Sequence, residues 1–209
     1  MGTEILYIAI AIIFAYLLGS VPSAYIAGRL RKGVDIREVG SRNVGAMNVF
    51  YKVGFVPGLL VLAADIGKGA AAVALARWLG VPMIAELFAG VAVVLGHGFP
   101  VFLKFRGGRG GATCIGILAF LMPWGIPFYL AIFGLGLLLT RYPTLSYSAA
   151  FICFPFVAWL KYHSWVLVVF SIGILLVPGI KYIPRIKEMR GTGGSWRHVA
   201  LRKNLKDRL

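Results

Sequence analysis

Long apolar stretches alternate with short polar segments along almost the whole chain. An α-helix needs about 20 predominantly apolar residues to cross the hydrocarbon core of a bilayer, and shorter stretches can cross where the bilayer thins or where loop residues are drawn in. The pattern predicts an all-α integral membrane protein with about seven transmembrane helices, six or eight being the alternatives. The predicted spans cover residues 5–28, 54–76, 81–103, 110–124, 126–140, 145–160 and 165–182.

Composition supports this class of protein and excludes two others. Of the 209 residues, 59% are hydrophobic and only 14% are charged, and the mean hydropathy is +0.84. A soluble domain has about 45–50% apolar and about 25% charged residues, so neither a soluble globular fold nor a disordered chain fits. The first apolar run follows no positive charge and is too long for the apolar core of a signal peptide, so we expect it to be a first transmembrane helix.

The distribution of basic residues predicts the orientation of the chain. With seven spans and the N-terminus outside, 19 of the 22 Lys and Arg residues fall in inside segments, Arg77 and Lys161 fall outside, and Lys68 lies within a span. Cytoplasmic loops carry an excess of Lys and Arg, so we expect the N-terminus outside and the C-terminus in the cytoplasm. Residues 1–182 are expected to form a single transmembrane catalytic domain, and residues 183–209 a basic cytoplasmic tail.

The net charge of +15 indicates anionic partners. The chain has too few polar residues for a basic face on a soluble fold, so we expect anionic membrane lipid and phosphorylated substrates, and no nucleic acid. The two cysteines, Cys114 and Cys153, lie inside apolar runs and are too few for a disulfide framework or a zinc site. We therefore expect them to be core residues, and we expect no metal site.

Three polar, glycine-rich segments lie near the predicted inside ends of the spans. The first, residues 39–48, combines hydroxyl and amide side chains with glycines that allow backbone N–H groups to converge on an anion. An ordinary solvated loop is the alternative. The candidate residues in this segment are Ser41, Asn43, Gly45 and Asn48.

The second segment places Asp65 and Lys68 in the middle of an apolar run. A charge at membrane depth costs at least about 2.5–3.5 kcal/mol on insertion scales, so each charge needs a partner. Three residues apart on a helix, the two side chains share a face and can pair. Two interpretations stay open: a structural ion pair that fixes helix packing, or a Lys68 that faces a wet cavity and meets a phosphate.

The third segment contains His97 and then a turn in which Arg106 and Arg109 flank glycines just before an apolar run. A glycine-rich turn, guanidinium groups and the free N–H groups of a helix N-terminus are typical of a phosphate site, although the spacing is not that of a Walker A loop. Two alternatives remain. The basic turn could only anchor the chain at the inside face of the membrane, and His97 could only form a structural hydrogen bond. Further candidates are Gly107, Gly108, Gly110 and Thr113, with a small polar cluster of Arg141 and Thr144 after the fifth span.

Taken together in order and spacing, these motifs resemble those of the bacterial acyl-phosphate:glycerol-3-phosphate acyltransferases, membrane enzymes of phospholipid synthesis. The resemblance covers nearly the whole chain. The matching residues are Leu18-Gly19-Ser20 with Pro22 and Ser23, Gly40-Ser41-x-Asn43-x-Gly45-Ala46-x-Asn48, Asp65-x-x-Lys68-Gly69, Gly96-His97 with Pro100, Gly107-Gly108-x-Gly110 with Ala112-Thr113, and Arg141-Tyr142.

The resemblance implies a reaction and a location. A fatty acyl group would pass from acyl phosphate to the 1-hydroxyl of glycerol 3-phosphate, or of a related polyol phosphate, and the products would be lysophosphatidic acid and phosphate. The resemblance implies no cofactor, a seven-spanning fold, and an active site at the cytoplasmic side of the bacterial inner membrane.

The site residues expected on this basis fall into two groups. Ser41, Lys68 and His97 are the expected catalytic residues. His97 is suited to general-base work near neutral pH, with proton transfer to the substrate phosphate as the alternative. The expected substrate-binding residues are Asn43, Gly45, Asn48, Arg106, Gly107, Gly108, Arg109, Gly110, Thr113, Arg141 and Thr144.

Departures from the family pattern keep other functions open. The family usually has Arg where this chain has Tyr51, and its C-terminal polar residues are replaced here near Pro184 and Gly193. A catalytically impaired family member, or one with a changed acceptor, is therefore an alternative. A transporter or channel for a phosphorylated anion is the other, because it would also explain the buried charge pair and the basic loops.

Overall fold

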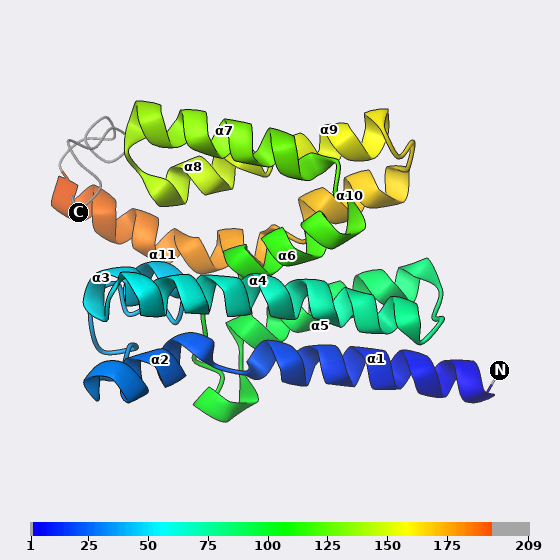
Figure 1. Ribbon diagram of the computed structural model, residues 1–209, viewed down its shortest axis with the longest axis horizontal. Coiled ribbons are helices and arrows are strands. Elements are labelled where there is room, and N and C mark those ends of the chain that lie inside the picture. The colour runs from blue at the N-terminus through cyan, green and yellow to red at the C-terminus, as the bar shows by residue number, and fades with distance from the viewer. Residues whose placement is uncertain (1, 194–209) are drawn as a thin grey trace. The chain divides into compact units, whose positions relative to one another are not determined.

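The computed structural model describes residues 2–193, which form two compact units divided between residues 121 and 122 (Figure 1). The predicted boundary at residue 182 falls within the last described helix, and residues 194–209 of the predicted tail lie outside the described part. The first unit contains α1 (Gly2–Ser20), α2 (Ser23–Lys32), α3 (Ala46–Lys52), α4 (Phe55–Trp78), α5 (Met83–Gly98), the 3-10 helix η1 (Val101–Leu103) and α6 (Gly111–Leu121). The second contains α7 (Gly125–Thr140), α8 (Pro143–Ala150), α9 (Cys153–Leu160), α10 (Trp165–Gly173) and α11 (Leu176–Gly193).

The predicted all-α architecture is confirmed for the described residues. Five helical stretches are long and apolar enough to cross a membrane, and α6 and α7 are shorter apolar helices. Many large apolar side chains lie exposed, as with Leu138, which is 79% accessible. Such surfaces suit hydrocarbon rather than water. The five stretches are Gly2–Lys32, Phe55–Trp78, Met83–Leu103, Pro143–Leu160 and Trp165–Glu188.

Three of the predicted spans are each divided into two helices. The breaks fall between α1 and α2, between α8 and α9, and between α10 and α11. Pro22 directly precedes α2, while Pro155 and Pro178 lie in the first turns of α9 and α11. Proline has no N–H to donate and its ring clashes with the carbonyl four residues earlier, so the preceding helix ends before it.

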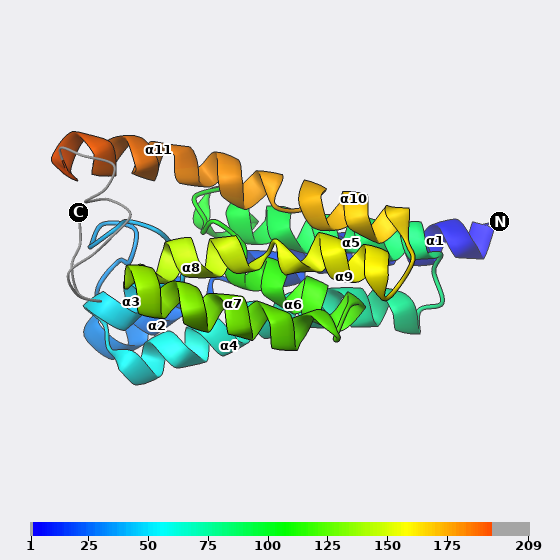
Figure 2. The ribbon, with the colours of Figure 1, turned by 90° about the horizontal axis from the view of Figure 1, so that it is seen from above.

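Glycines allow close approach of the helices in the first unit. Gly19 of α1 lies against the backbone of Val93 in α5, and Gly116 of α6 lies against the backbone of Ile66 in α4, so that a Cβ at either glycine would overlap a carbonyl oxygen. Small residues of this kind are typical of membrane helix interfaces, where close backbone packing replaces the hydrophobic effect. α1 and α5 pack together, as do α4 and α6 (Figures 1 and 2).

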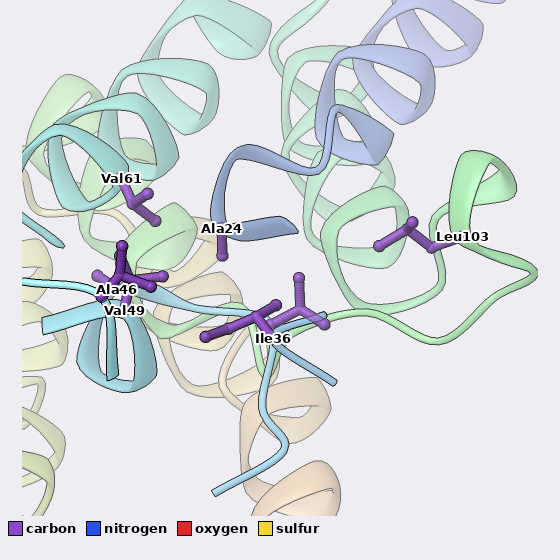
Figure 3. Packing of buried hydrophobic residues seen from close by; sticks show 8 residues of the cluster. Ala24, Ile36, Ala46, Val49, Val61 and Leu103 are labelled. Carbon is purple, nitrogen blue, oxygen red and sulfur yellow. The ribbon is translucent and has the colours of Figure 1, made fainter. Parts of the chain in front are cut away.

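A small hydrophobic cluster holds the connections at one end of the first unit. It joins α2, the loop that follows α2, α3, α4 and η1, and Figure 3 shows the side chains converging from these segments. Ile36 and Val49 are fully buried in it. The cluster consists of Ala24, Ile36, Val44, Ala46, Val49, Val53, Val61 and Leu103. Two of the predicted polar segments are thus anchored beside one another, through Val44 and Leu103.

The second unit is held by aromatic packing and by side-chain hydrogen bonds. The rings of Tyr129, Phe151 and Phe154 contact one another between α7 and α9. The hydroxyls of Tyr142 and Tyr182 share a hydrogen bond that joins the start of α8 to α11.

Candidate active site

Asp65 is the centre of a buried polar cluster in the first unit. Its side chain is 1% exposed, and its Oδ1 accepts hydrogen bonds from Ser23 Oγ at 2.7 Å and pairs with Lys68 Nζ at 2.8 Å. Nδ1 of His97 lies 3.5 Å from the same oxygen. The predicted Asp65–Lys68 pair is confirmed. The carboxylate is shared among three helices, α2, α4 and α5, so the cluster also ties them together.

Lys68 also serves the break between α1 and α2. Its Nζ donates at 3.3 Å to the carbonyl oxygen of Val21, which also accepts from the amide of Ser23 at 3.1 Å in the turn around Pro22. A pocket adjoins the ammonium group, so the two interpretations of Lys68 are not exclusive: it forms an ion pair and it lines a cavity. The lining residues are Gly19, Ser20, Val21, Pro22, Ser23, Ala24, Val44, Lys68, His97 and Pro100.

His97 connects this pocket to the glycine-arginine turn. The amide of Gly108 donates to the carbonyl of His97 at 3.0 Å. A Cβ at Gly108 would overlap Nε2 of His97 and the carbonyl of Val44, and a Cβ at Gly107 would overlap the end of α5. With Nδ1 directed at Asp65, the other ring nitrogen lies beside Gly108. An imidazole oriented in this way by a carboxylate is a suitable general base.

Asn48 organises the first polar segment from within. Its side chain is 2% exposed, and its Nδ2 lies 2.9 Å from the carbonyls of Ile36 and Val39 and 3.1 Å from that of Asn43. Its Oδ1 accepts from the amide of Ser41 at 3.1 Å. The Asn48 amide therefore holds the loop by backbone contacts, and substrate contact by Asn48 stays a prediction. Ser41 and Asn43 are half-buried and Gly45 is buried.

The two arginines of the arginine turn differ in solvent exposure. Arg106 is exposed, whereas Arg109 is half-buried. Gly110 has φ +94, a left-handed conformation that favours glycine, and it leads directly into α6. Thr113, in the first turn of α6, is fully buried and its hydroxyl has no hydrogen-bond partner within residues 2–193. Substrate contact by Thr113 stays a prediction.

The second unit contains Arg141 and Thr144, the last two predicted site residues. Arg141 is exposed with φ +52 and links α7 to α8, and Thr144 is half-buried in the first turn of α8. The turn is closed by the hydroxyl of Thr140, which donates to Gly136 and accepts from the amide of Tyr142. The predicted contact of Arg141 and Thr144 with substrate stays a prediction.

Two features of the first unit were not predicted. One is the contribution of Ser23 and the Val21 carbonyl to the Asp65 cluster. The signal for it is a pair of serines around Pro22 inside an apolar run, since polar side chains and unpaired carbonyls at membrane depth require partners. Among the described residues, no group of three or more His, Cys, Asp and Glu side chains is placed to hold a metal ion.

The other feature is a pair of ion pairs that Asp35 forms with Arg29 and Arg37 at the start of the loop after α2, which we call the basic clasp. Arg37 lies 2.7 Å from the buried carboxylate of Asp35, Arg29 lies 3.4 Å from it, and both guanidinium groups lie over the ring of Tyr25. The hydrogen bonds from Arg37 are the main cause that lowers the pKa of Asp35 to about 2, against the opposing effect of burial. The clasp fixes the exit of α2 just before the Asn48-held loop.

Comparison with known proteins gives a consistent family. The family model described as glycerol-3-phosphate acyltransferase matches residues 9–191. A protein of Dehalococcoides mccartyi named glycerol-3-phosphate acyltransferase 2 is 53% identical over 99% of both chains. A glycerol-3-phosphate acyltransferase of Bacillus subtilis is 49% identical over 66% of this chain and 72% of its own length.

A solved structure agrees with the same family. The crystal structure of PlsY, described as an integral membrane glycerol 3-phosphate acyltransferase in its glycerol 3-phosphate form, matches with a TM-score of 0.81 and 32% identity, covering 88% of this chain and 92% of that one. The sequence motifs had predicted a membrane acyltransferase. The match over residues 9–191, the full-length relative and the shared integral membrane fold establish that this chain belongs to the glycerol-3-phosphate acyltransferase family.

Proposed function

We propose that the protein transfers a fatty acyl group from acyl phosphate to the 1-hydroxyl of glycerol 3-phosphate, releasing lysophosphatidic acid and inorganic phosphate. The observation that carries this proposal is the pocket at which Lys68 and His97 meet around Asp65, next to the glycine-arginine turn. The reaction joins two phosphorylated molecules; the Lys68 ammonium lines this pocket, and His97, which also lines it, contacts the turn that carries Arg106 and Arg109.

The chemistry follows from the leaving group. The hydroxyl oxygen of glycerol 3-phosphate attacks the acyl carbon, the bond between that carbon and the phosphate oxygen breaks, and phosphate departs with the electron pair. The hydroxyl proton passes to His97 Nε2 or to the departing phosphate. Because acyl phosphate already carries a good leaving group, the protein mainly holds two anions together and stabilises the charge that develops on the carbonyl oxygen.

Individual residues take distinct parts in this scheme. Arg106 and Arg109 with the adjoining glycines bind a substrate phosphate, and Ser41 and Asn43 orient the acceptor. Lys68 supplies positive charge at the pocket. Asn48 acts as a positioning residue, since its buried amide fixes the backbone that presents Ser41. The acyl chain lies between helices, in contact with lipid.

We also propose that all seven apolar stretches cross the bacterial inner membrane, with the N-terminus outside and residues 1–182 acting as one transmembrane domain. Support comes from the charge distribution and from the tryptophans. In the described residues, Trp78, Trp124, Trp159 and Trp165 all lie at the ends of spans that the charge distribution places outside, where aromatic residues meet the head groups.

The test is product formation by the purified protein in lipid nanodiscs. Acyl phosphate and glycerol 3-phosphate are supplied together, a panel of other polyol phosphates replaces the acceptor in parallel, and lipid products are identified by mass. We expect lysophosphatidic acid and phosphate in a 1:1 ratio. If the folded protein forms no acylated product with any acceptor, it is a catalytically impaired member and the proposal fails. Flux of glycerol 3-phosphate into vesicles without acyl transfer would instead support a transporter.

A further inference from the structure

The segment between α2 and α3 carries an arginine in a backbone conformation that arginine rarely adopts. Arg42 has φ +56, in the left-handed region, where a Cβ is disfavoured and glycine is not. Its side chain is exposed, and within the described residues no hydrogen bond, ion pair or ring contact of that side chain is present. The residue therefore carries a strained backbone without a side-chain contact that would compensate for it.

The backbone around Arg42 is held by other groups. The amide of Arg42 donates to the carbonyl of Val39 at 3.1 Å, and the amide of Ser41 donates to Asn48 Oδ1 at 3.1 Å. The carbonyl of Asn43 accepts from both Asn48 and the amide of Gly45, each at 3.1 Å. The loop would keep these bonds with glycine at position 42. Local strain of this kind is concentrated at functional sites. A contact with a bound ligand would explain why an arginine occupies this position.

Packing places the connection that carries this arginine against the arginine turn. Val44 lies two residues after Arg42, and its carbonyl lies against Gly108, one of the two glycines between Arg106 and Arg109. Val44 and Leu103 also share the hydrophobic cluster shown in Figure 3. Three guanidinium groups are thus carried by two connections that touch each other, next to the pocket that contains Lys68.

We infer that Arg42 is a further substrate-binding residue, whose guanidinium binds the phosphate of glycerol 3-phosphate. This inference rests on the proposed function. The side chain lies on a connection outside the apolar stretches, where a water-borne dianion arrives, whereas the acyl donor is held by its chain in lipid. A guanidinium can form two parallel charge-assisted hydrogen bonds with a phosphate, which sets both affinity and orientation.

The test compares Arg42→Gly, Arg42→Gln and Arg42→Lys with Arg31→Gln, a matched control for an exposed arginine of α2. We expect KM for glycerol 3-phosphate to rise about 10-fold or more in the Gly and Gln variants, since a charge-assisted hydrogen bond is lost, with kcat near that of the unaltered protein. Lys restores part of the affinity. Arg42→Gly should melt at the same or a higher temperature, because glycine relieves the backbone strain while the charge is lost.

Three outcomes would overturn the inference. The first is a KM for glycerol 3-phosphate within twofold of the unaltered protein in both the Gly and Gln variants. The second is a rise in KM for acyl phosphate alone, which would place the other substrate at Arg42. The third is an effect that disappears when anionic lipid is omitted from the nanodiscs, which would make Arg42 a head-group contact.

Binding of glycerol 3-phosphate, measured by calorimetry without acyl donor, separates this inference from the proposed function. If the protein forms no product but Arg42→Gly still weakens binding, the proposed function fails and the inference stands. If product forms and neither KM nor binding depends on Arg42, the inference fails and the function stands. If the unaltered protein neither binds glycerol 3-phosphate nor acylates it, both fail.

Discussion

Mutation of Lys68 is expected to affect both stability and activity. Its ammonium compensates the buried carboxylate of Asp65 and also caps the Val21 carbonyl where α1 ends. Removing it leaves a carboxylate in an apolar region with one donor fewer, and breaking a buried pair from one side costs about 3–5 kcal/mol. A loss of activity on mutation of Lys68 is therefore informative only when stability is measured beside it.

We expect Lys68→Ala to lower both the melting temperature and kcat/KM, and Lys161→Ala to change neither much. Lys161 is an exposed residue that lies over the ring of Trp124. The double variant Asp65→Asn with Lys68→Met removes both charges, so stability should recover in part while activity stays low. Should the folded double variant turn over at the normal rate, the Asp65–Lys68 pair would be purely structural.

The glycines of the arginine turn are tightly packed, so substituting them disturbs the packing and does not report on phosphate binding alone. A side chain at Gly108 collides with His97 and Val44 whether or not phosphate binds. Gly108→Val is thus expected to disrupt folding, and it cannot separate a phosphate site from a lipid anchor. The arginines are the informative positions.

For Arg106→Gln and Arg109→Gln we expect kcat/KM to fall about 10- to 150-fold, the equivalent of a charge-assisted hydrogen bond worth about 1.5–3 kcal/mol. Insertion and melting temperature should be unaltered. The measurement is kcat/KM on protein shown to be correctly inserted. Near-normal values in both variants would move the phosphate site elsewhere, to the loop of residues 41–48.

At the scale of the elements, the end of α2 is held by ion pairs as well as by the hydrophobic cluster. Asp35 is buried against two arginines at a helix exit, and glycine at residue 33 ends the helix with φ +65. The carboxylate must be ionised for both pairs to form. The loop that carries Ser41 begins at this clasp. Protonation of Asp35 should therefore loosen the loop as well as lower stability.

The pKa of Asp35 is lowered to about 2 in the folded protein, so stability rises with pH across the range in which the unfolded chain still binds a proton that the folded protein has released. This contribution to stability is fully present above about pH 4 and is lost as the pH falls towards about pH 2. We expect Asp35→Asn to lower the melting temperature at pH 7. The difference from the unaltered protein should shrink as the pH is lowered from about 4 to 2 in detergent. A difference independent of pH in that window would show that the carboxylate charge is not what stabilises the loop.

At the scale of the whole molecule, the proposed orientation rests on charged and aromatic residues together. Most basic residues gather at one set of predicted span ends, and the four tryptophans among residues 2–193 lie at the other, which is the asymmetry expected when one side faces the cytoplasm. Glu86 and Arg77, paired at 3.0 Å, satisfy each other at an end predicted to lie outside.

Single-cysteine labelling tests the orientation. Cys114 and Cys153 are buried and should not react in the folded protein, so Gly2→Cys and Arg208→Cys can be introduced separately. We expect Gly2→Cys to label from the periplasmic side and Arg208→Cys only after the membrane is opened. Labelling of both from one side would require an even number of crossings and would contradict the seven-span proposal.

The sequence by itself determined the all-α membrane class, the order of the polar motifs, the family and the Asp65–Lys68 pair. The membrane class and the ion pair depend on local information, such as the length of apolar runs or two residues one helical turn apart, and the family depends on the order and spacing of motifs along the chain. The same local patterns identified His97 and the arginine turn as candidate chemistry, because polar groups and clustered glycines are conspicuous in an apolar chain. They did not indicate the helix breaks before Pro22, Pro155 and Pro178 as such, although proline is the physical cause of each.

Only the tertiary structure decided which of these groups meet. Asp65 is 32 residues from His97 and 42 from Ser23, and their contact depends on how α2, α4 and α5 pack. The same holds for Asn48, whose amide is used by the backbone of its own loop, and for Gly108, which is required by the neighbouring His97 and Val44. Spacing along one helix is set by its own geometry, whereas contacts between helices depend on the summed packing of many side chains, and no short stretch of sequence contains that information.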